Sequence, residues 1–358
     1  MIYIKLYHIS RRISTVFYKK HSPIIDFLRK TWYNVIRNLN MAGKIMKTLL
    51  KILIYILGIA LLLVILAWGA LNIAKFFIYS DYYSIKSNVC ENPGLSDGFV
   101  CQGICAYEDE QLIFVSGYMA DDSPSRIYVT DTESNFYYVS LTAEGEPFTG
   151  HAGGISVWQD RVYVASGKKL YTLDAKKLAS ASNGESVEMT VAASVNNSAS
   201  FCFADDDYVY VGEFHDGGKY VTDHPYETDE GMHYAIVTLY SHSDLQTPIR
   251  IYSIRNKVQG FCVTDMGRII LSTSYGLTSS VYYVYNAEDA IDSGLTLDGA
   301  PVYYLSDCVR EMTGPAMAEG LDVFNSEVIT LTESASNKYI FGKFFFASKI
   351  VSLDFEQE

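Results

Sequence analysis

Residues 102–118 read QGICAYEDEQLIFVSGY, and residues 259–275 read QGFCVTDMGRIILSTSY. Each stretch has a short apolar segment, a polar turn and a second apolar segment that ends in small polar residues. Apolar runs of this length and period are typical of β-strands and not of helices. A third copy begins at Glu319-Gly320-Leu321 and ends at Glu333. The repeated pair therefore predicts a repeated antiparallel β-unit.

Two looser copies begin at Gly153 and Ser200, so the pattern occurs five times. Each copy is followed by a predicted third strand: 126–131, 169–174, 235–240, 281–286 and 349–354. Fourth strands fit at 136–141, 187–193, 248–254 and 301–305. The last copy lacks a fourth strand, and residues 82–90 are the expected replacement.

A repeat of roughly 50 residues with four strands is the signature of a β-propeller blade. Radial packing of such blades leaves only short edge strands. The sequence therefore predicts an all-β fold, a five-bladed β-propeller preceded by a single transmembrane helix. A ring of six or seven blades with degenerate copies is the alternative.

The composition divides the chain into two parts. Residues 1–51 contain eleven basic residues and one acidic residue, a net charge of +10, and the remainder has 17 basic and 40 acidic residues, a net charge of −23. A nucleic-acid partner is not expected for an acidic domain, because phosphate binding needs a basic surface. The 29 tyrosines also suit β-structure.

Residues 52–71 carry no charge, and twenty residues are enough to span a bilayer. Lys44, Lys47 and Lys51 precede this run, so the positive-inside rule places the N-terminus in the cytoplasm. We expect a basic cytoplasmic segment over 1–47, a signal-anchor helix over 48–77 and an extracytoplasmic domain over 78–358. A cleaved signal peptide is the competing interpretation, and Met41 offers an alternative start of translation.

The repeat pattern over about 82–357 resembles the β-propeller superfamily that includes NHL-repeat, quinoprotein-like and gluconolactonase-like proteins. It is more similar to uncharacterised bacterial membrane-anchored propellers. The resemblance implies architecture and not activity, since propellers carry many functions. A narrower similarity, to calcium-dependent apyrases, implies an axial Ca²⁺ held where inner strands begin. Glu319 matches such a start, but the other blades have no carboxylate there, which puts the calcium and the phosphohydrolase chemistry in doubt.

In a propeller, the starts of the first strands and the ends of the second strands open on one face. This geometry predicts that polar side chains converge on one mouth as ligand-binding residues: Gln102, Gln259, Glu319, Glu213, Ser274, Tyr275 and Glu333, with Ser116 and Ser166 beside them. The alternative is that the amides only satisfy backbone groups around a water-filled channel. His151 is the candidate general base there, with Glu319 and Glu333 as further catalytic candidates. Glu319, Glu213 and Glu333 are the candidate metal ligands.

Two loops on that face have unusual composition. Residues 215–233 hold three histidines and several acids, a set compatible with a transition metal, but no compact ligand spacing occurs and a solvated loop is favoured. Residues 337–346 are rich in aromatic residues and predict either a contact patch or part of the core.

All six cysteines follow the apolar run, which permits a Cys90–Cys101 or Cys90–Cys308 disulfide. Cys105, Cys202 and Cys262 follow equivalent strand starts, and we interpret them as small packing residues. Three converging thiolates would also suit a soft metal, the alternative interpretation.

No Walker loop, dinucleotide fingerprint or nucleophile elbow occurs. These observations predict a membrane-tethered propeller that binds a glycan, a peptide or a protein. A metal-assisted hydrolase or lactonase with its site on the propeller axis is the alternative, and no cofactor is expected beyond Ca²⁺.

Overall fold

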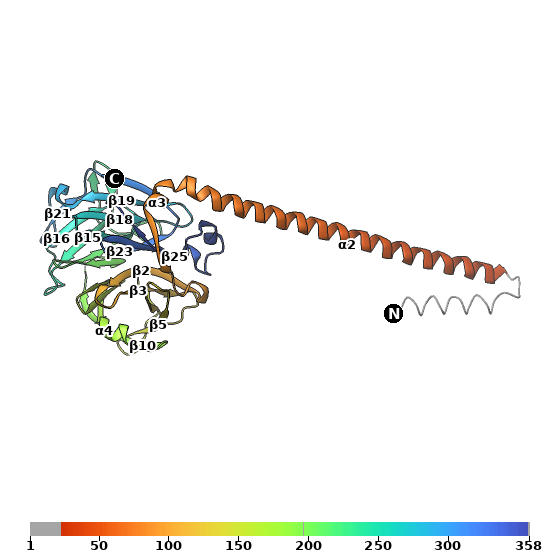
Figure 1. The fold of residues 1–358 in the computed structure, drawn as a ribbon, viewed down its shortest axis with the longest axis horizontal. Helices are drawn as coiled ribbons and strands as arrows, with labels where there is room; N and C mark the ends of the chain where they lie inside the picture. Colours follow the sequence, from red (N-terminus) through yellow and green to blue (C-terminus); the bar gives the residue numbers. More distant parts are fainter. Residues whose placement is uncertain (1–22, 196, 357–358) are drawn as a thin grey trace. The chain divides into compact units, whose positions relative to one another are not determined.

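The computed structural model describes residues 23–195 and 197–356 (Figure 1), so residues 1–22 of the expected basic segment lie outside the described residues. The chain divides into two compact units, residues 1–70 and 71–358, each described here by itself.

The first unit consists, in its described part, of most of helix α2 (Pro23–Ile78). Within the described residues, α2 is the one helix long and apolar enough to cross a membrane, and its apolar side chains are exposed. Length and composition support a membrane anchor, and a signal sequence passes the same test.

The second unit is built mostly of β-strands, and eight of the strands between β2 and β10 form two antiparallel sets. The first set is β2 (Phe99–Tyr107), β3 (Leu112–Met119), β4 (Arg126–Thr130) and β5 (Phe136–Ala143). The second set is β7 (Gly154–Trp158), β8 (Arg161–Ser166), β9 (Lys169–Asp174) and β10 (Glu185–Ser194), with helix α4 (Ala175–Ala179) between β9 and β10. Strand β10 also pairs in parallel with β5, so the two sets form one sheet, and the short β6 (Glu146–Pro147) adds to β5.

The later strands repeat the same order. A third set is β11 (Phe201–Ala204), β12 (Val209–Gly212), β15 (Ala235–Tyr240) and β16 (Arg250–Ile254). A fourth set is β17 (Val258–Val263), β18 (Arg268–Thr273), β19 (Ser280–Asn286) and β22 (Arg310–Gly314), and a fifth is β23 (Ala318–Phe324), β24 (Glu327–Thr332), β25 (Lys349–Leu353) and β1 (Lys86–Glu91). A small hairpin, β13 (Tyr226–Thr228) and β14 (Gly231–His233), interrupts the third set.

One strand assignment from the sequence is wrong. Residues 301–305 were expected as the fourth strand beside β19, but β21 (Ala300–Tyr304) forms a hairpin with β20 (Ile291–Leu297). The β20–β21 hairpin extends the neighbouring sheet by parallel pairing of β21 with β16, and these two strands lie side by side in Figure 1. Strand β22 takes the expected place beside β19. Strand composition does not specify which edge a hairpin joins, because the pairing depends on contacts distant in sequence.

The closing strand is confirmed over most of its expected length. Residues 86–91 form β1, which pairs antiparallel with β25 at the other end of the domain. Residues 82–85 instead belong to helix α3 (Ser80–Ile85), in which Tyr82 and Ile85 are buried. Positions three apart lie on one face of a helix, so both side chains pack against the domain. The two ends of the domain are therefore joined without a covalent bond.

The first strands of the five sets, β2, β7, β11, β17 and β23, contact one another in succession, and β23 contacts β2 again. Glycine permits the close approach of neighbouring backbones. A Cβ on Gly154 would lie 2.4 Å from the amide nitrogen of Cys202, and one on Gly320 would lie 2.9 Å from the Cα of Gly103. The fold is therefore mostly β and of propeller type, with the inner strands in mutual contact.

Candidate functional site

A cavity of about 970 Å³ lies where the inner strands begin, and we call it the axial cavity. Seven residues that the sequence singled out line it: Gln102, His151, Ser166, Gln259, Ser274, Tyr275 and Glu333. They come from all but one of the five sets of strands or from the loops between them. The structure therefore brings most of the predicted polar side chains to one place.

Buried Glu319 and partly buried Glu333 meet the amides beside this cavity. Nε2 of Gln102 donates a hydrogen bond to Oε2 of Glu333 at 3.1 Å, and Nε2 of Gln259 lies 3.4 Å from Oε1 of Glu319. Glu319 is only 2% exposed and is not among the lining residues. Burial raises the pKa of Glu319 well above its ordinary value, and the charge of Glu333 raises it further. Burial also raises the pKa of Glu333 to about 7.

Glu213 and Ser116, which the sequence placed at the mouth, do not line the axial cavity. The carboxylate of buried Glu213 accepts hydrogen bonds from the backbone N–H groups of Ser198 (3.0 Å) and Ile236 (3.3 Å). It also contacts Nδ1 of His224 at 2.8 Å. The hydroxyl of Ser116 donates to the carbonyl of Ala152. Both side chains therefore satisfy neighbouring polar groups, and the sequence could not distinguish that role from a ligand contact.

His151 lines the axial cavity and stacks on Tyr118, with ring centres 4.1 Å apart and planes 14° apart. Burial lowers the pKa of His151, and the charges of Lys338 and Lys219 lower it further. This lowering of the pKa favours the neutral imidazole, the form that a general base requires.

The sequence interpretation missed the residues that form the rim. Tyr118, Lys168, Lys219 and Tyr220 line the axial cavity together with Tyr339. The Nζ atom of Lys338 donates a hydrogen bond to the hydroxyl of Tyr118. One signal was available, because Tyr118 lies two residues after Ser116 in β3, nearer the end of the strand that the sequence placed at the mouth, and alternate residues share a face. The lysines lie in turns, where no alternation of apolar and polar residues indicates on which side of the chain a side chain lies.

Most residues of the histidine-rich loop are exposed, as the sequence favoured, but two of its histidines are not. His215 and His233 are buried. Nδ1 of His215 lies 2.9 Å from Oγ1 of Thr222, and its ring stacks on Tyr234. Burial lowers the pKa of His233 to about 4, with a smaller effect of Arg255. In the described part of the chain, no group of three or more His, Cys, Asp or Glu side chains is arranged to hold a metal ion.

The aromatic loop of residues 337–346, which follows β24, is partly packed and partly an exposed contact surface, the two alternatives that the sequence left open. Tyr339 lines the axial cavity, whereas Ile340 and Phe341 are 75% and 69% exposed. The ammonium group of Lys75 lies 4.7 Å from the ring centre of Phe346 at the end of the loop. The loop is therefore part of the cavity wall on one side and an apolar surface on the other.

All six cysteines lie in the described residues, and all are free thiols, so neither proposed disulfide is formed. Cys105, Cys202 and Cys262 are buried, and burial raises the pKa of each thiol. Buried, protonated thiols behave as small apolar groups. The packing interpretation agrees with these positions.

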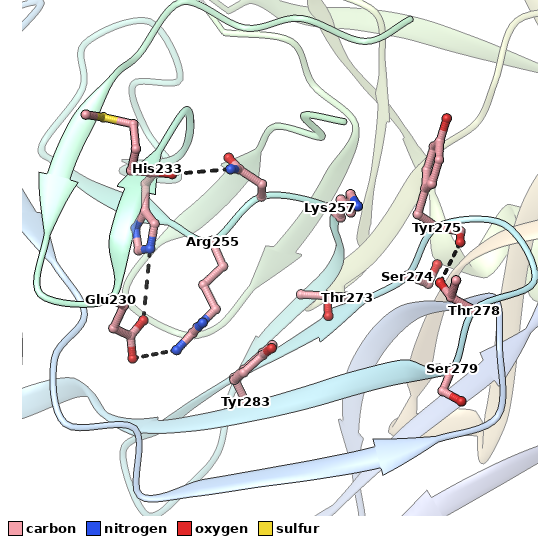
Figure 2. A pocket seen from close by; sticks show the side chains of 12 residues that line it. Glu230, His233, Arg255, Lys257, Thr273, Ser274, Tyr275, Thr278, Ser279 and Tyr283 are labelled. Carbon is pink, nitrogen blue, oxygen red and sulfur yellow. Dashed lines mark hydrogen bonds and ion pairs between the residues drawn. The ribbon is translucent and has the colours of Figure 1, made fainter. Parts of the chain in front are cut away.

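A second, smaller cavity of about 260 Å³ adjoins the axial cavity, and Ser274 and Tyr275 line both (Figure 2). We call it the Arg255 pocket. Nη2 of Arg255 lies 2.7 Å from Oε1 of Glu230, and Nε2 of His233 lies 4.0 Å from Oε2 of the same carboxylate. The sequence interpretation did not identify Arg255, because its role depends on partners from other strands.

No family model matches this sequence, and no curated protein matches it. Solved structures are similar at low identity. The PQQ-bound aldose sugar dehydrogenase of Streptomyces coelicolor has a TM-score of 0.38 and 14% identity over 69% of this chain and 77% of that one. RS223-β-xylosidase has a TM-score of 0.40 and 10% identity over 76% of this chain and 95% of that one. BamB of Moraxella catarrhalis has a TM-score of 0.31 and 10% identity over 72% of this chain and 84% of that one. Similarity at this level carries no information on activity.

Proposed function

We propose that this chain is a membrane-tethered, extracytoplasmic β-propeller of five blades that binds a polar ligand, first of all a glycan, in the axial cavity. A peptide or a segment of a partner protein is the other ligand class of the same proposal. The observation that carries it is the cavity of about 970 Å³ lined by amides, hydroxyls and tyrosine rings from several sets of strands. Ligand sites of this kind combine aromatic surfaces with a few placed polar groups.

The five-bladed architecture is supported by the five inner strands in successive contact, each followed by its own outer strands. The tether is supported by the apolar length of α2 and by the lysines before it, with one lysine, Lys75, closely after it. The positive-inside rule then places residues 1–47 in the cytoplasm and 78–358 outside.

Ligand binding is tested with the full chain in detergent micelles against a panel of oligosaccharides and peptides, by thermal unfolding. A ligand at about 100 times its Kd stabilises the folded state by about 2.7 kcal/mol. We expect the midpoint to rise for the wild type and less for Tyr220→Ala, which removes a rim ring. Phe136→Ala removes an exposed ring outside the cavity and is the matched control. If no panel member raises the midpoint, or if Tyr220→Ala responds as the wild type does, the binding proposal is wrong.

The tether has a separate test. We expect the mature protein in membranes to retain its N-terminal region and to resist extraction at alkaline pH. N-terminal sequencing that finds cleavage near residues 67–70 would show a signal peptide instead.

A second candidate, a hydrolase or lactonase, is favoured by one specific observation. The pKa values of buried Glu319 and of partly buried Glu333 are raised, and Glu333 lines the axial cavity, as His151 does. Such carboxyl groups suit general acid catalysis near neutral pH. If this proposal is right, the protein hydrolyses an ester, lactone or glycoside substrate in a Ca²⁺-dependent reaction. Glu333→Gln should abolish that hydrolysis. If Glu333→Gln and added chelator leave every hydrolytic rate unchanged, only the binding function remains.

A further inference from the structure

The Arg255 pocket is polar, and its charged side chains come from three positions. Arg255 and Lys257 are basic and Glu230 is acidic (Figure 2). His233 adds no charge at pH 7, because burial holds its pKa at about 4. The pocket therefore has an excess of one positive charge, although residues 52–358 as a whole carry a net charge of −23.

Arg255 is held in place by three different contacts. Its Nη2 atom pairs with Glu230, its Nε donates to the hydroxyl of Tyr285 at 2.7 Å, and its guanidinium carbon lies 4.0 Å from the ring centre of Tyr283. The hydroxyl of Tyr285 in turn donates to Oε2 of Glu230 at 2.9 Å. A guanidinium group that is already oriented loses little entropy when it binds an anion.

Lys257, two residues after Arg255 and exposed, provides the second positive charge of the lining. Its backbone N–H donates to the carbonyl of His215, and its carbonyl accepts from Ser274, so the turn is fixed. The φ angle of Lys257 is +66°, a conformation that favours glycine over any residue with a side chain. Its Nζ lies 5.1 Å from the ring centre of Tyr275, which lines both cavities.

Hydroxyl groups complete the lining. Thr278 and Ser279 follow Tyr275 in the same loop, and Figure 2 shows both on the side of the pocket opposite Glu230. The hydroxyl of Thr278 donates to the carbonyl of Tyr275 at 2.8 Å. The proton of Thr278 is engaged in that bond, and Oγ of Ser279 lies 3.1 Å from the hydroxyl of Tyr79, so the two cationic side chains are the groups that would attract an oxyanion.

We propose that the Arg255 pocket binds an anionic oxygen group, a carboxylate, phosphate or sulfate, carried by the ligand of the axial cavity. The inference rests on the proposed binding function and specifies its ligand as an acidic molecule. Ser274 and Tyr275 form the wall common to the two cavities, so one ligand reaches both. Arg255 and Lys257 hold the anionic group, and Glu230 positions Arg255.

The test compares sodium phosphate, sulfate and acetate with sodium chloride at equal ionic strength, using thermal unfolding of the full chain in micelles. We expect all three oxyanions to raise the midpoint of unfolding. Phosphate and sulfate should raise it more than acetate if the natural anionic group is tetrahedral, and acetate should raise it more if that group is planar. Lys257→Met keeps the apolar stem and the backbone strain but removes the charge, and we expect it to weaken anion affinity about tenfold or more. Lys257→Arg keeps the charge and should retain binding. Lys177→Met, on the exposed surface of α4, is the matched control.

Two results with simple anions overturn the inference, and a third result, with oligosaccharides, does so as well. One is that no oxyanion raises the wild-type midpoint beyond chloride, and the other is that Lys257→Met responds as the wild type does. A neutral oligosaccharide that stabilises wild type and Lys257→Met equally, better than its acidic counterpart, would overturn the anionic subsite and leave the proposed binding function intact.

Discussion

Nε2 of Gln102 donates a hydrogen bond to Oε2 of Glu333 at 3.1 Å, across 231 residues of chain. The contact joins the inner strand of the first set to the end of β24 in the last set, beside the strand pairing of β1 and β25 that closes the domain. The axial cavity and the closure of the domain thus depend on the same neighbouring strands.

The buried carboxyl groups predict a pH dependence of stability. Burial raises the pKa of Glu333 from 4.5 to about 7 and that of Asp322 from 3.8 to about 7. Between these values the folded state binds more protons than the unfolded state, so the contribution of these groups to stability falls as pH rises toward 7. We expect Glu333→Gln to be more stable than the wild type at about pH 8 and to lose that advantage near pH 5, as measured by urea unfolding. Glu327→Gln, at the other end of β24, is the control, and an equal pH slope in both variants would contradict the prediction.

The contributions of two histidines to stability should change with pH in opposite directions. Burial lowers the pKa of His233 from 6.5 to about 4, so its effect is to make stability rise as pH increases between these values. A hydrogen bond to Glu213 raises the pKa of His224 above 6.5, so its stabilisation is present below 6.5 and is lost as pH rises through the higher folded value. Chemical unfolding of His233→Gln and His224→Gln should therefore show differences from wild type with opposite signs of pH dependence. Parallel curves would show that one of the two environments is wrong.

Close approach of the inner strands makes Gly154 irreplaceable. A Cβ there would lie 2.4 Å from the backbone nitrogen of Cys202 and 2.5 Å from the Cα of Phe201, and backbone atoms cannot yield cheaply. We expect Gly154→Ala to lower the free energy of unfolding by about 2–3 kcal/mol or more. Gly218→Ala meets only the side chain of Asp216, beyond 3.6 Å, and should change it by less than about 0.5 kcal/mol. Equal effects in a urea titration would mean that the inner strands do not pack this closely.

The closing strand pair should contribute strongly to stability. Ile350 on β25 is fully buried opposite Cys90 on β1. Truncation by Ile350→Ala leaves a cavity and should cost about 2–5 kcal/mol. Ile340→Ala makes the same chemical change at an exposed position and should cost less than about 0.5 kcal/mol. Similar losses for the two variants in denaturant unfolding would contradict the observed closure.

The cysteines should differ in how fast their thiols react with an alkylating reagent. Burial raises the thiol pKa of all six cysteines, but Cys308 is half-buried and accessible to reagent, whereas the other five are buried. Because the thiolate is the reactive form, we expect iodoacetamide to label Cys308 first in the native protein, at least about tenfold faster than the rest. Mass spectrometry of peptides after brief labelling gives the order. Early modification of Cys105, Cys202 and Cys262 together would contradict their role as packing residues.

Much of the fold could be predicted from the sequence, because the decisive information is local. Period-two apolar runs and the Gln-Gly pair repeated in β2 and β17 indicate strands in this chain. The shortage of strands after the last copy also indicated that residues before β2 complete the final sheet, as β1 does. The uncharged run of residues 52–71, which lies within α2, could be recognised by a count of residues.

What the tertiary structure alone decided is which side chains meet. Whether Glu213 faces a ligand or a backbone N–H, and whether β21 joins β19 or β16, depends on contacts between residues far apart in sequence. The pairing of Arg255 with Glu230 and the nearness of Lys257 to Tyr275 have the same origin. The alternation of side chains along a strand determines which face of the sheet a residue lies on. The direction of a turn and the sheet edge that a hairpin joins are determined by the free energy of packing the whole domain.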